Sequence, residues 1–139
     1  MPYKERNDQR KKTSLKVLIV EDDLYFREII QLYLEGEGNQ VELAENGIQA
    51  QKKIGQKEFD IVLSDIQMPE MNGIELIEWI KSSESLSFTD IEKLPIVLMT
   101  GFAHSMDKNK AKEMGINELL NKPFSNRDLI KAIRKTLSK

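Results

Sequence analysis

The stretch KVLIVEDD at residues 16–23 decides the fold of this chain. Four consecutive apolar residues, three of them β-branched, follow Lys16 and stop at the acidic run Glu21, Asp22 and Asp23. A short apolar run without polar alternation is typical of a strand that is buried on both faces, as in a parallel sheet. The sequence therefore predicts a buried parallel strand whose carboxyl end carries three acidic side chains.

Similar strands recur along the chain. The run 61–63 stops at Ser64 and Asp65, and the run 96–99 stops at Thr100 and Gly101. A short mixed run at 41–43 is typical of an edge strand, and a last short strand is expected at 118–120, just before Lys122.

Helical patterns separate the predicted strands. The first has apolar residues at helical spacing and ends at Gly36 and Gly38, and these apolar residues are Phe26, Ile29, Ile30, Tyr33 and Leu34. Further helices are expected after Asn46, after Asn72, from about Ser105 and after Ser125, with a polar connection over 82–94. Five strands and five helices in strict alternation predict an α/β fold, with a single doubly wound parallel sheet and helices on both faces.

Composition narrows the class of protein. The chain has 139 residues, which fits one domain, and 40% hydrophobic residues, which is enough for a core. Because it has no cysteine, a disulfide framework and a thiolate metal site are excluded, and the lone His104 cannot build a multi-histidine site. No apolar run approaches the roughly 20 residues of a membrane span, and the N-terminus has no signal-peptide pattern. We expect a cytoplasmic protein without membrane contact.

The charge is unevenly distributed. Residues 1–16 hold six Lys or Arg and two Asp or Glu, whereas residues 17–139 hold fifteen basic and twenty-one acidic residues. An acidic body argues against direct binding of nucleic acid, which needs a concentrated basic face. We expect residues 1–15 to be a basic flexible segment and residues 16–139 to form the folded domain.

The polar residues at the predicted strand ends indicate the chemistry. In open parallel sheets, ligands bind beyond the carboxyl ends of the strands. Crowded carboxylates raise one another's pKa, and a hard divalent cation such as Mg²⁺, or alternatively Mn²⁺, relieves this repulsion. Thr100 and Lys122 opposite such a cation would complete a cradle for a tetrahedral anion. The sequence predicts a site for a phosphoryl group, either bound or carried covalently on a carboxylate.

Four segments in order, VLIVEDD, VLSDIQMPEMNG, PIVLMTG and LLNKPF, resemble the receiver domain of two-component response regulators, of the chemotaxis-receiver type. The resemblance covers residues 16–137, and each segment lies at the end of a predicted strand. It implies a flavodoxin-like (βα)5 fold with strand order 2-1-3-4-5, and a receiver domain over residues 16–139.

The resemblance also implies the phosphoacceptor and its metal ligands. Asp65 would attack the phosphohistidine of a sensor histidine kinase or of a histidine phosphotransfer protein. Mg²⁺ would be held by Glu21, Asp22, Asp65 and the main-chain carbonyl of Gln67. The first position of the acidic pair is more often Asp in this family.

Three further residues acquire roles from the resemblance. Thr100 matches the hydroxyl that reorients toward the phosphoryl group, and Lys122 matches the cation that pairs with the acceptor or with phosphoryl oxygens. The bond between Lys122 and Pro123 is implied to be cis, because this isomer is accessible mainly before proline.

Two positions depart from the family pattern. Receivers often carry Tyr or Phe three residues before the lysine, as the partner of the threonine switch, and this chain has Leu119. Gly101 stands where Ala or Ser is frequent, and this small residue leaves the phosphoryl group open to water or a partner. We expect Gly101 and Gln67 to tune dephosphorylation.

Three functions follow as hypotheses. The first is a phosphorylation switch, not an enzyme, that changes the binding of an unknown output partner through the face formed by the fourth helix, fifth strand and fifth helix. The second is a Mg²⁺-dependent phosphohydrolase, which would usually have Asp where this chain has Gln67. The third is a pseudo-receiver that works without phosphorylation. It would predict a lost acceptor, acidic pair or lysine, and only Leu119 favours it.

Overall fold

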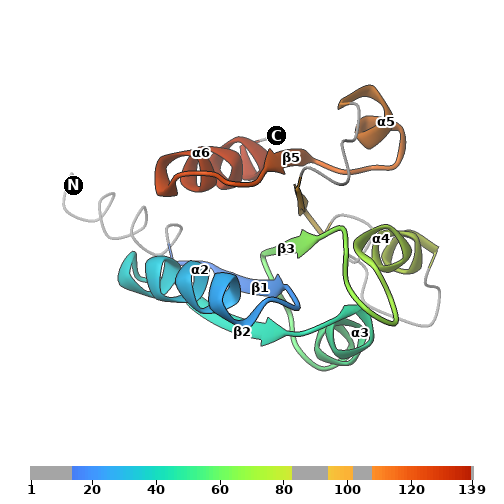
Figure 1. Cartoon of the computed structure of the whole chain (residues 1–139), viewed down its shortest axis with the longest axis horizontal. Coiled ribbons are helices and arrows are strands. Elements are labelled where there is room, and N and C mark those ends of the chain that lie inside the picture. Colours follow the sequence, from blue (N-terminus) through green and yellow to red (C-terminus); the bar gives the residue numbers. More distant parts are fainter. Residues whose placement is uncertain (1–13, 83–93, 102–107, 139) are drawn as a thin grey trace, which may run out of the picture.

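The computed structural model describes residues 14–82, 94–101 and 108–138 of the chain. The predictions for residues 1–13, for the connection at 83–93, for His104 and for the start of a helix at about Ser105 lie outside the described residues. Strands and helices alternate along the chain (Figure 1). The elements are β1 (Lys16–Val20), α2 (Leu24–Gly36), β2 (Gln40–Ala44), α3 (Gly47–Gln56), β3 (Ile61–Asp65), α4 (Gly73–Ser82), β4 (Ile96–Thr100), α5 (Lys108–Glu113), β5 (Glu118–Asn121) and α6 (Asn126–Leu137).

The sheet has the predicted topology. Its five strands are all parallel and lie in the order β2-β1-β3-β4-β5, so the expectation of a doubly wound sheet with order 2-1-3-4-5 is confirmed. The strands with uninterrupted apolar runs, β1, β3 and β4, occupy the centre, and the mixed strand β2 lies at an edge. An unalternated strand has apolar side chains on both faces, and therefore only a central position buries it fully.

Helices cover both faces of the sheet. On one face, Val17 and Ile19 of β1 belong to a core cluster with residues of α2 and α6. On the other face, Leu18 and Val20 belong to a cluster with residues of α3, α4 and α5. Figure 1 shows α2 and α6 on one side of the sheet and α3 and α4 on the other. Alternate residues of one strand thus enter two different cores, as the pleat of a strand requires.

Side-chain caps define where the helices begin. The Asp23 carboxylate accepts a hydrogen bond from the Phe26 amide at 3.1 Å, and the Asn46 side chain accepts one from Gln49 at 2.9 Å. Ser125 forms a capping box at the start of α6. Asp23 is therefore a helix cap, which satisfies a free amide group, and it is not a member of the acidic cluster described below.

The buried face of helix α2 differs from the apolar stripe that its sequence suggests. Ile29, which has helical spacing with Phe26 and Tyr33, is 51% exposed. Arg27 is buried instead, on the same face as Ile30 and Leu34. The helix carries apolar residues around more of its circumference than one sheet can cover, and a polar contact described below holds Arg27 on the inward side. Across the described residues, the helices are all too short or too polar to cross a membrane.

Candidate functional site

The carboxyl ends of the central strands converge at one rim of the sheet. The register pairs Val20 of β1 with Ser64 of β3, and it pairs Asp65 with Met99 of β4. The next pairing, across β4 and β5, sets Thr100 beside Asn121. Residues that follow these strands therefore meet at the rim, although more than 40 residues separate some of them along the chain, as with Val20 and Ser64. This is the position where open parallel sheets bind ligands.

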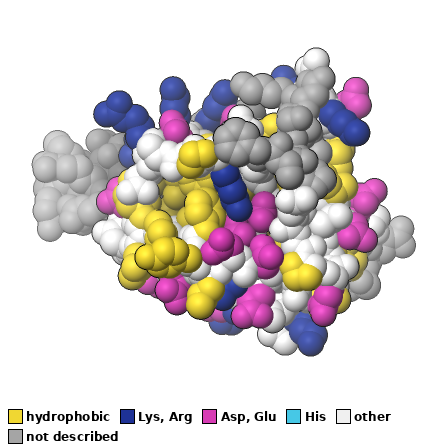
Figure 2. Space-filling view, viewed as in Figure 1, with side chains coloured by type: hydrophobic (Ala, Val, Ile, Leu, Met, Phe, Trp, Pro, Cys, Tyr) yellow, Lys and Arg dark blue, Asp and Glu magenta, His cyan; other side chains and the backbone are white. Residues whose placement is uncertain are grey.

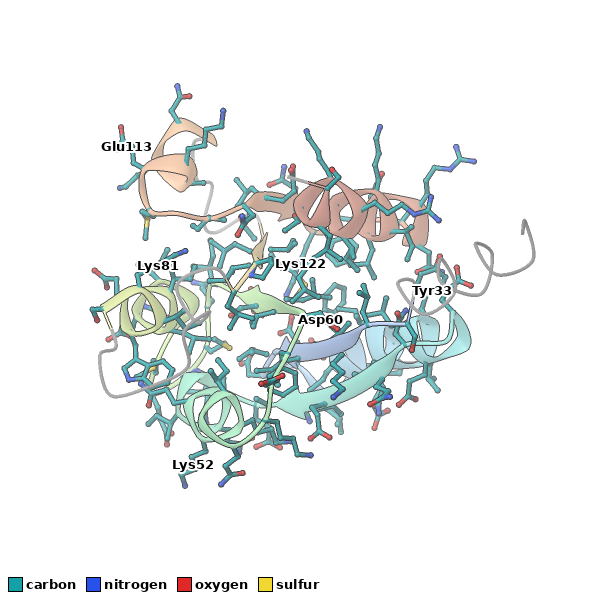
Figure 3. The ribbon with its side chains drawn as sticks, turned by 180° about the vertical axis from the view of Figure 1, so that it is seen from behind. Tyr33, Lys52, Asp60, Lys81, Glu113 and Lys122 are labelled. Atoms are coloured by element: carbon teal, nitrogen blue, oxygen red, sulfur yellow. The ribbon has the colours of Figure 1, made fainter. Side chains whose placement is uncertain are left out.

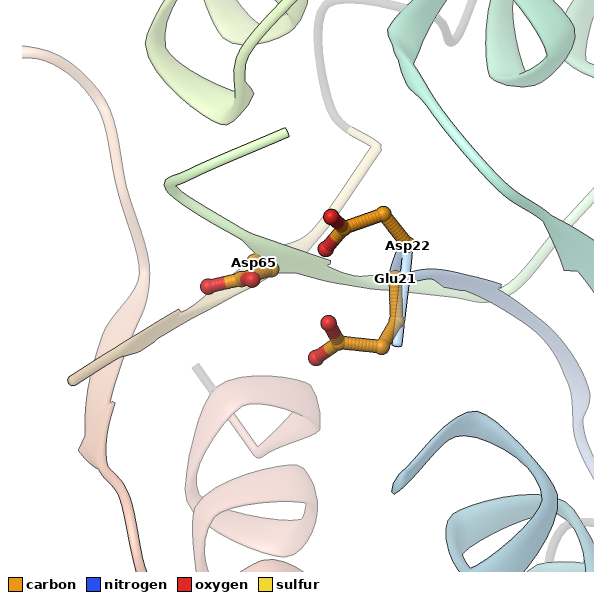
Figure 4. A group of neighbouring side chains, drawn as sticks. All are labelled: Glu21, Asp22 and Asp65. Carbon is orange, nitrogen blue, oxygen red and sulfur yellow. The ribbon is translucent and has the colours of Figure 1, made fainter. Parts of the chain in front are cut away.

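Three carboxylates form a cluster at this rim. One oxygen each of Glu21, Asp22 and Asp65 lies within 4.8 Å of the others (Figure 4). Glu21 is 1% exposed and Asp65 is 7% exposed, whereas Asp22 is open to solvent. Two ligands of one Mg²⁺ lie at most about 4.2 Å apart, since each lies about 2.1 Å from the ion. The donor set and its spacing therefore fit a hard divalent cation after small side-chain rotations.

Lys122 connects two of these carboxylates. Its Nζ lies 2.6 Å from Oε1 of Glu21 and 3.3 Å from Oδ2 of Asp65 (Lys122 is labelled in Figure 3). The backbone amide of Lys122 donates to the Thr100 carbonyl at 2.7 Å, which anchors it beside the end of β4. The Lys122–Pro123 peptide bond is cis.

An aromatic ring lies beside the ammonium, and a second ring packs against the first. Nζ of Lys122 lies 4.5 Å from the centre of the Phe26 ring, which is within the range of a cation–π interaction. The Phe26 ring meets Phe124 edge to face, with centroids 5.4 Å apart. The first turn of α2 thus covers one side of the ammonium, and Phe124 supports the ring that does so.

Burial and charge shift the pKa values in the cluster. Burial raises the pKa of Glu21 to about 7, and the hydrogen bond from Lys122 opposes this rise while the charge of Asp65 adds to it. Burial alone would lower the pKa of Lys122, but the hydrogen bond and charge of Glu21 outweigh it, and the pKa lies above its ordinary value. The lysine therefore stays charged at neutral pH and compensates the buried carboxylates.

The remaining predicted residues lie at or near the same rim. Thr100 is buried at the end of β4, and its hydroxyl donates to the Gly101 carbonyl at 3.2 Å. Within the described part of the chain, a Cβ at Gly101 would meet no atom within 4 Å. Gln67 is exposed in the loop after β3. Leu119 is half-buried and packs against the core cluster that faces α3 and α4.

Two residues at the rim were missed by the sequence analysis. The Gly73 amide donates to the Ile66 carbonyl at 2.9 Å, and a Cβ on Gly73 would lie 2.3 Å from the carbonyl oxygen of Asp65. Arg27 donates from Nη1 to the main-chain carbonyl of Glu21 at 2.7 Å. A glycine at a helix start and an arginine in a helix have many ordinary explanations, and only the contacts reveal these two roles.

Comparison with known proteins identifies the class of this fold and site. Residues 17–134 match the family described as the response regulator receiver domain. The chain belongs to this family, and it is therefore a receiver domain of two-component signalling. Members of the family are signalling domains that interact with sensor histidine kinases.

Two relatives are regulators of transcription by name. The chain is 34% identical to the probable transcriptional regulator ycf29 of Pyropia yezoensis over 91% of its own length and 54% of that protein. It is also 34% identical to the transcriptional regulatory protein CpxR homolog of Haemophilus influenzae, over 88% of this chain and 50% of that protein. The chain thus spans about half the length of these relatives.

Solved structures share the fold. The chemotaxis response regulator CheY4 of Vibrio cholerae superimposes with a TM-score of 0.75 at 31% identity, over 89% of this chain and 99% of that chain. The receiver domain of a sensor histidine kinase from Pseudomonas aeruginosa PAO1 has a TM-score of 0.77 at 25% identity, over 91% of this chain and 99% of that one. That structure has a magnesium ion coordinated in its active site cleft.

Proposed function

We propose that this receiver domain accepts a phosphoryl group on Asp65 and thereby switches the binding of a partner. The observation that carries the proposal is a buried Asp65 carboxylate with the Lys122 ammonium at 3.3 Å and two further carboxylates within 4.8 Å. In the reaction, an Asp65 oxygen attacks the phosphorus of a phosphohistidine. The P–N bond breaks, and imidazole leaves with the electron pair, while the acceptor becomes an acyl phosphate.

The acidic cluster is the proposed metal site. Glu21, Asp22 and Asp65 would hold Mg²⁺ together with the main-chain carbonyl of Gln67, and Mn²⁺ is the alternative cation. When bound, the cation neutralises charge on the transferring phosphoryl group. Oxygen donors at this spacing suit such a cation, and three crowded carboxylates with one ammonium leave net negative charge for it to balance.

Lys122 and Thr100 are the proposed readers of the phosphorylated state. After phosphorylation, negative charge moves from the Asp65 carboxylate to the phosphoryl oxygens, and the Lys122 ammonium would follow it. The Thr100 hydroxyl would turn from its bond with Gly101 toward the same oxygens. Gly101 and Gln67 border the path of an attacking water, so we expect them to tune dephosphorylation. These roles are those of a signalling domain and not of an enzyme that turns over an external substrate.

An exposed apolar patch on α2 supports docking of the phosphodonor protein. Leu24, Tyr25, Ile29 and Leu32 are each between 51% and 77% exposed, and their helix begins directly after the acidic cluster. Figure 2 shows hydrophobic side chains gathered next to acidic ones on this face. Exposed apolar groups of this kind mark protein contacts. We propose that a sensor histidine kinase or a histidine phosphotransfer protein binds here, in the cytoplasm, with its phosphohistidine over Asp65.

The output surface is proposed to be the face formed by α5, β5 and α6. The segment from Asn121 to Phe124 links β5 to α6 and contains Lys122, so movement of the ammonium is coupled most directly to these two elements. Helix α6 exposes four basic side chains, which are Arg127, Lys131, Arg134 and Lys135. We propose that this surface contacts an output protein.

Intact mass spectrometry tests the proposed function. Incubation with acetyl phosphate and Mg²⁺ is expected to add one phosphoryl group, which hydroxylamine removes because an acyl phosphate is labile. Excess chelator is expected to prevent the addition, because the cluster then lacks its cation. A chain that gains no phosphoryl group from acetyl phosphate or phosphoramidate with Mg²⁺ would contradict the proposal. Equal labelling with and without chelator would show that phosphorylation of the chain does not need the cation.

Lys122→Ala separates phosphorylation from its readout. We expect Mg²⁺ binding to remain largely intact, because Lys122 is not a metal ligand, and acetyl phosphate still to label Asp65. The chemical shifts of β5 and α6, followed by NMR, should then change much less on phosphorylation than in the unaltered chain. Shifts of equal size in both proteins would show that the ammonium does not transmit the signal.

A further inference from the structure

Arg27 makes a contact that the proposed phosphorylation chemistry does not use. It is only 6% exposed, although it carries a charge, and a buried guanidinium needs compensating partners. Its Nη1 donates to the main-chain carbonyl of Glu21 at 2.7 Å, and its Nη2 lies 3.6 Å from Glu45, whose side chain is 61% exposed. The short, buried bond to Glu21 is therefore its principal interaction, since exposed ion pairs contribute little.

The carbonyl of Glu21 has a particular place in the site. It belongs to the peptide unit that joins Glu21 to Asp22, and this unit is planar. A hydrogen bond to that oxygen therefore restricts rotation of the plane, which sets the directions in which both acidic side chains leave the backbone. Asp22 is exposed, so packing alone does not orient it.

The other polar atoms of Glu21 are also held. Its amide donates to the Ala44 carbonyl at 3.0 Å, Oε2 accepts from the Asp23 amide at 3.2 Å and Oε1 accepts from Lys122 at 2.6 Å. Among these contacts, only that of Arg27, in the first turn of α2, acts on the plane shared with Asp22. The geometry points to Arg27 as a positioning residue, which aligns the Glu21–Asp22 pair for the cation. The inference rests on the proposed function, because it needs Mg²⁺ at the acidic cluster.

Removal of the Arg27 guanidinium should change the affinity for Mg²⁺ in opposite directions, depending on whether the residue acts through its charge or by positioning the acidic pair. If the guanidinium acted only through its charge, its removal would make the cluster more negative and tighten Mg²⁺ binding. If it orients the acidic pair, its removal weakens binding despite the lost repulsion. Groups that orient metal ligands through hydrogen bonds typically change metal affinity by about 10- to 100-fold. The direction of the change therefore decides between the two.

The test measures Mg²⁺ binding by calorimetry, without phosphorylation. Arg27→Met keeps the length of the side chain and removes the donor, and we expect the Kd for Mg²⁺ to rise by about 10-fold or more. Arg27→Lys restores one donor but not the fork of the guanidinium, so its Kd should lie about threefold below that of Arg27→Met and still above that of the unaltered chain. Glu45→Gln is the matched control, since it removes the exposed ion pair and leaves the bond to Glu21, and its Kd should stay within about twofold.

Thermal unfolding supplies a second readout. At a given concentration, a ligand raises Tm more when it binds the folded state more tightly, so the rise in Tm on addition of Mg²⁺ should be smaller for Arg27→Met than for the unaltered chain. A purely structural role would lower Tm equally with and without Mg²⁺. Should Arg27→Met not fold without the ion, the Kd of Arg27→Lys decides, because an unchanged or lower value overturns the inference.

The possible results distinguish failure of the Arg27 role from failure of the proposed metal site. If the unaltered chain shows neither heat of binding nor a Tm shift with Mg²⁺, the metal site and this inference both fail. If the unaltered chain binds Mg²⁺ and Arg27→Met binds it equally or more tightly, the positioning role fails alone. If the Kd of Glu45→Gln is as high as that of Arg27→Met, the positioning role also fails, because the effect then belongs to the ion pair.

Discussion

Asp65→Asn is expected to abolish uptake of a phosphoryl group while the chain stays folded. The amide has the shape of the carboxylate, but it is a much weaker nucleophile, and the acyl phosphate cannot form on it. The fold does not depend on the lost charge, because Asp65 is one of three crowded carboxylates around one ammonium. Intact mass after incubation with acetyl phosphate and Mg²⁺ should show no labile addition.

The same variant is expected to change the titration of Glu21. The charge of Asp65 is one of the causes that raise the pKa of Glu21 to about 7, so removing that charge should lower this pKa. A carboxyl with a raised pKa stabilises the fold less as the pH rises through that value, and Asp65→Asn should therefore reduce the loss of stability near neutral pH in metal-free protein. NMR titration of the Glu21 side chain measures the shift. A labile phosphoryl group on Asp65→Asn would disprove the assignment of the acceptor.

Gly73→Ala is expected to disturb both stability and phosphorylation. A Cβ at this position would lie 2.3 Å from the Asp65 carbonyl oxygen and 3.1 Å from the Cα of Ile66. Both are backbone atoms, so the start of α4 and the end of β3 must move apart. We expect a loss of about 3 kcal/mol in the free energy of unfolding. Phosphorylation by acetyl phosphate should slow by at least about tenfold, because the acceptor is displaced.

Gly36→Ala is the matched control for this substitution. Gly36 is the last residue of α2, and a Cβ there would meet no atom of the described residues within 4 Å. Its free energy of unfolding should be unchanged or increased by up to about 1 kcal/mol, since alanine favours helix. Denaturant unfolding of both variants gives the comparison. Equal stability of Gly73→Ala and the unaltered chain would show that the start of α4 and the end of β3 can move apart without loss of stability.

The order of strands and helices was accessible from the sequence. The apolar runs of β1, β3 and β4 predicted buried central strands, and the structure places all three in the middle of the sheet. The caps at Asp23 and Asn46 were accessible too, because a cap acts within a few residues of itself. Local signals of this kind depend on neighbouring residues alone.

The faces of α2 could not be predicted in the same way. Helical spacing grouped Ile29 with the inward residues, yet Ile29 is exposed and Arg27 is buried. A pattern of apolar residues does not contain the acceptor that compensates a buried guanidinium. That acceptor is the Glu21 carbonyl, and its position depends on how β1 meets the helix.

The sequence by itself determined that acidic residues, a threonine and a lysine lie at the carboxyl ends of four of the five strands, because strand and helix periods are local properties. Only the tertiary structure decided that Lys122 lies between Glu21 and Asp65, that Phe26 lies beside it and that Gly73 touches the backbone of Asp65. These contacts join residues from different elements. Their distances follow from strand register and helix packing, which no single segment of the chain specifies.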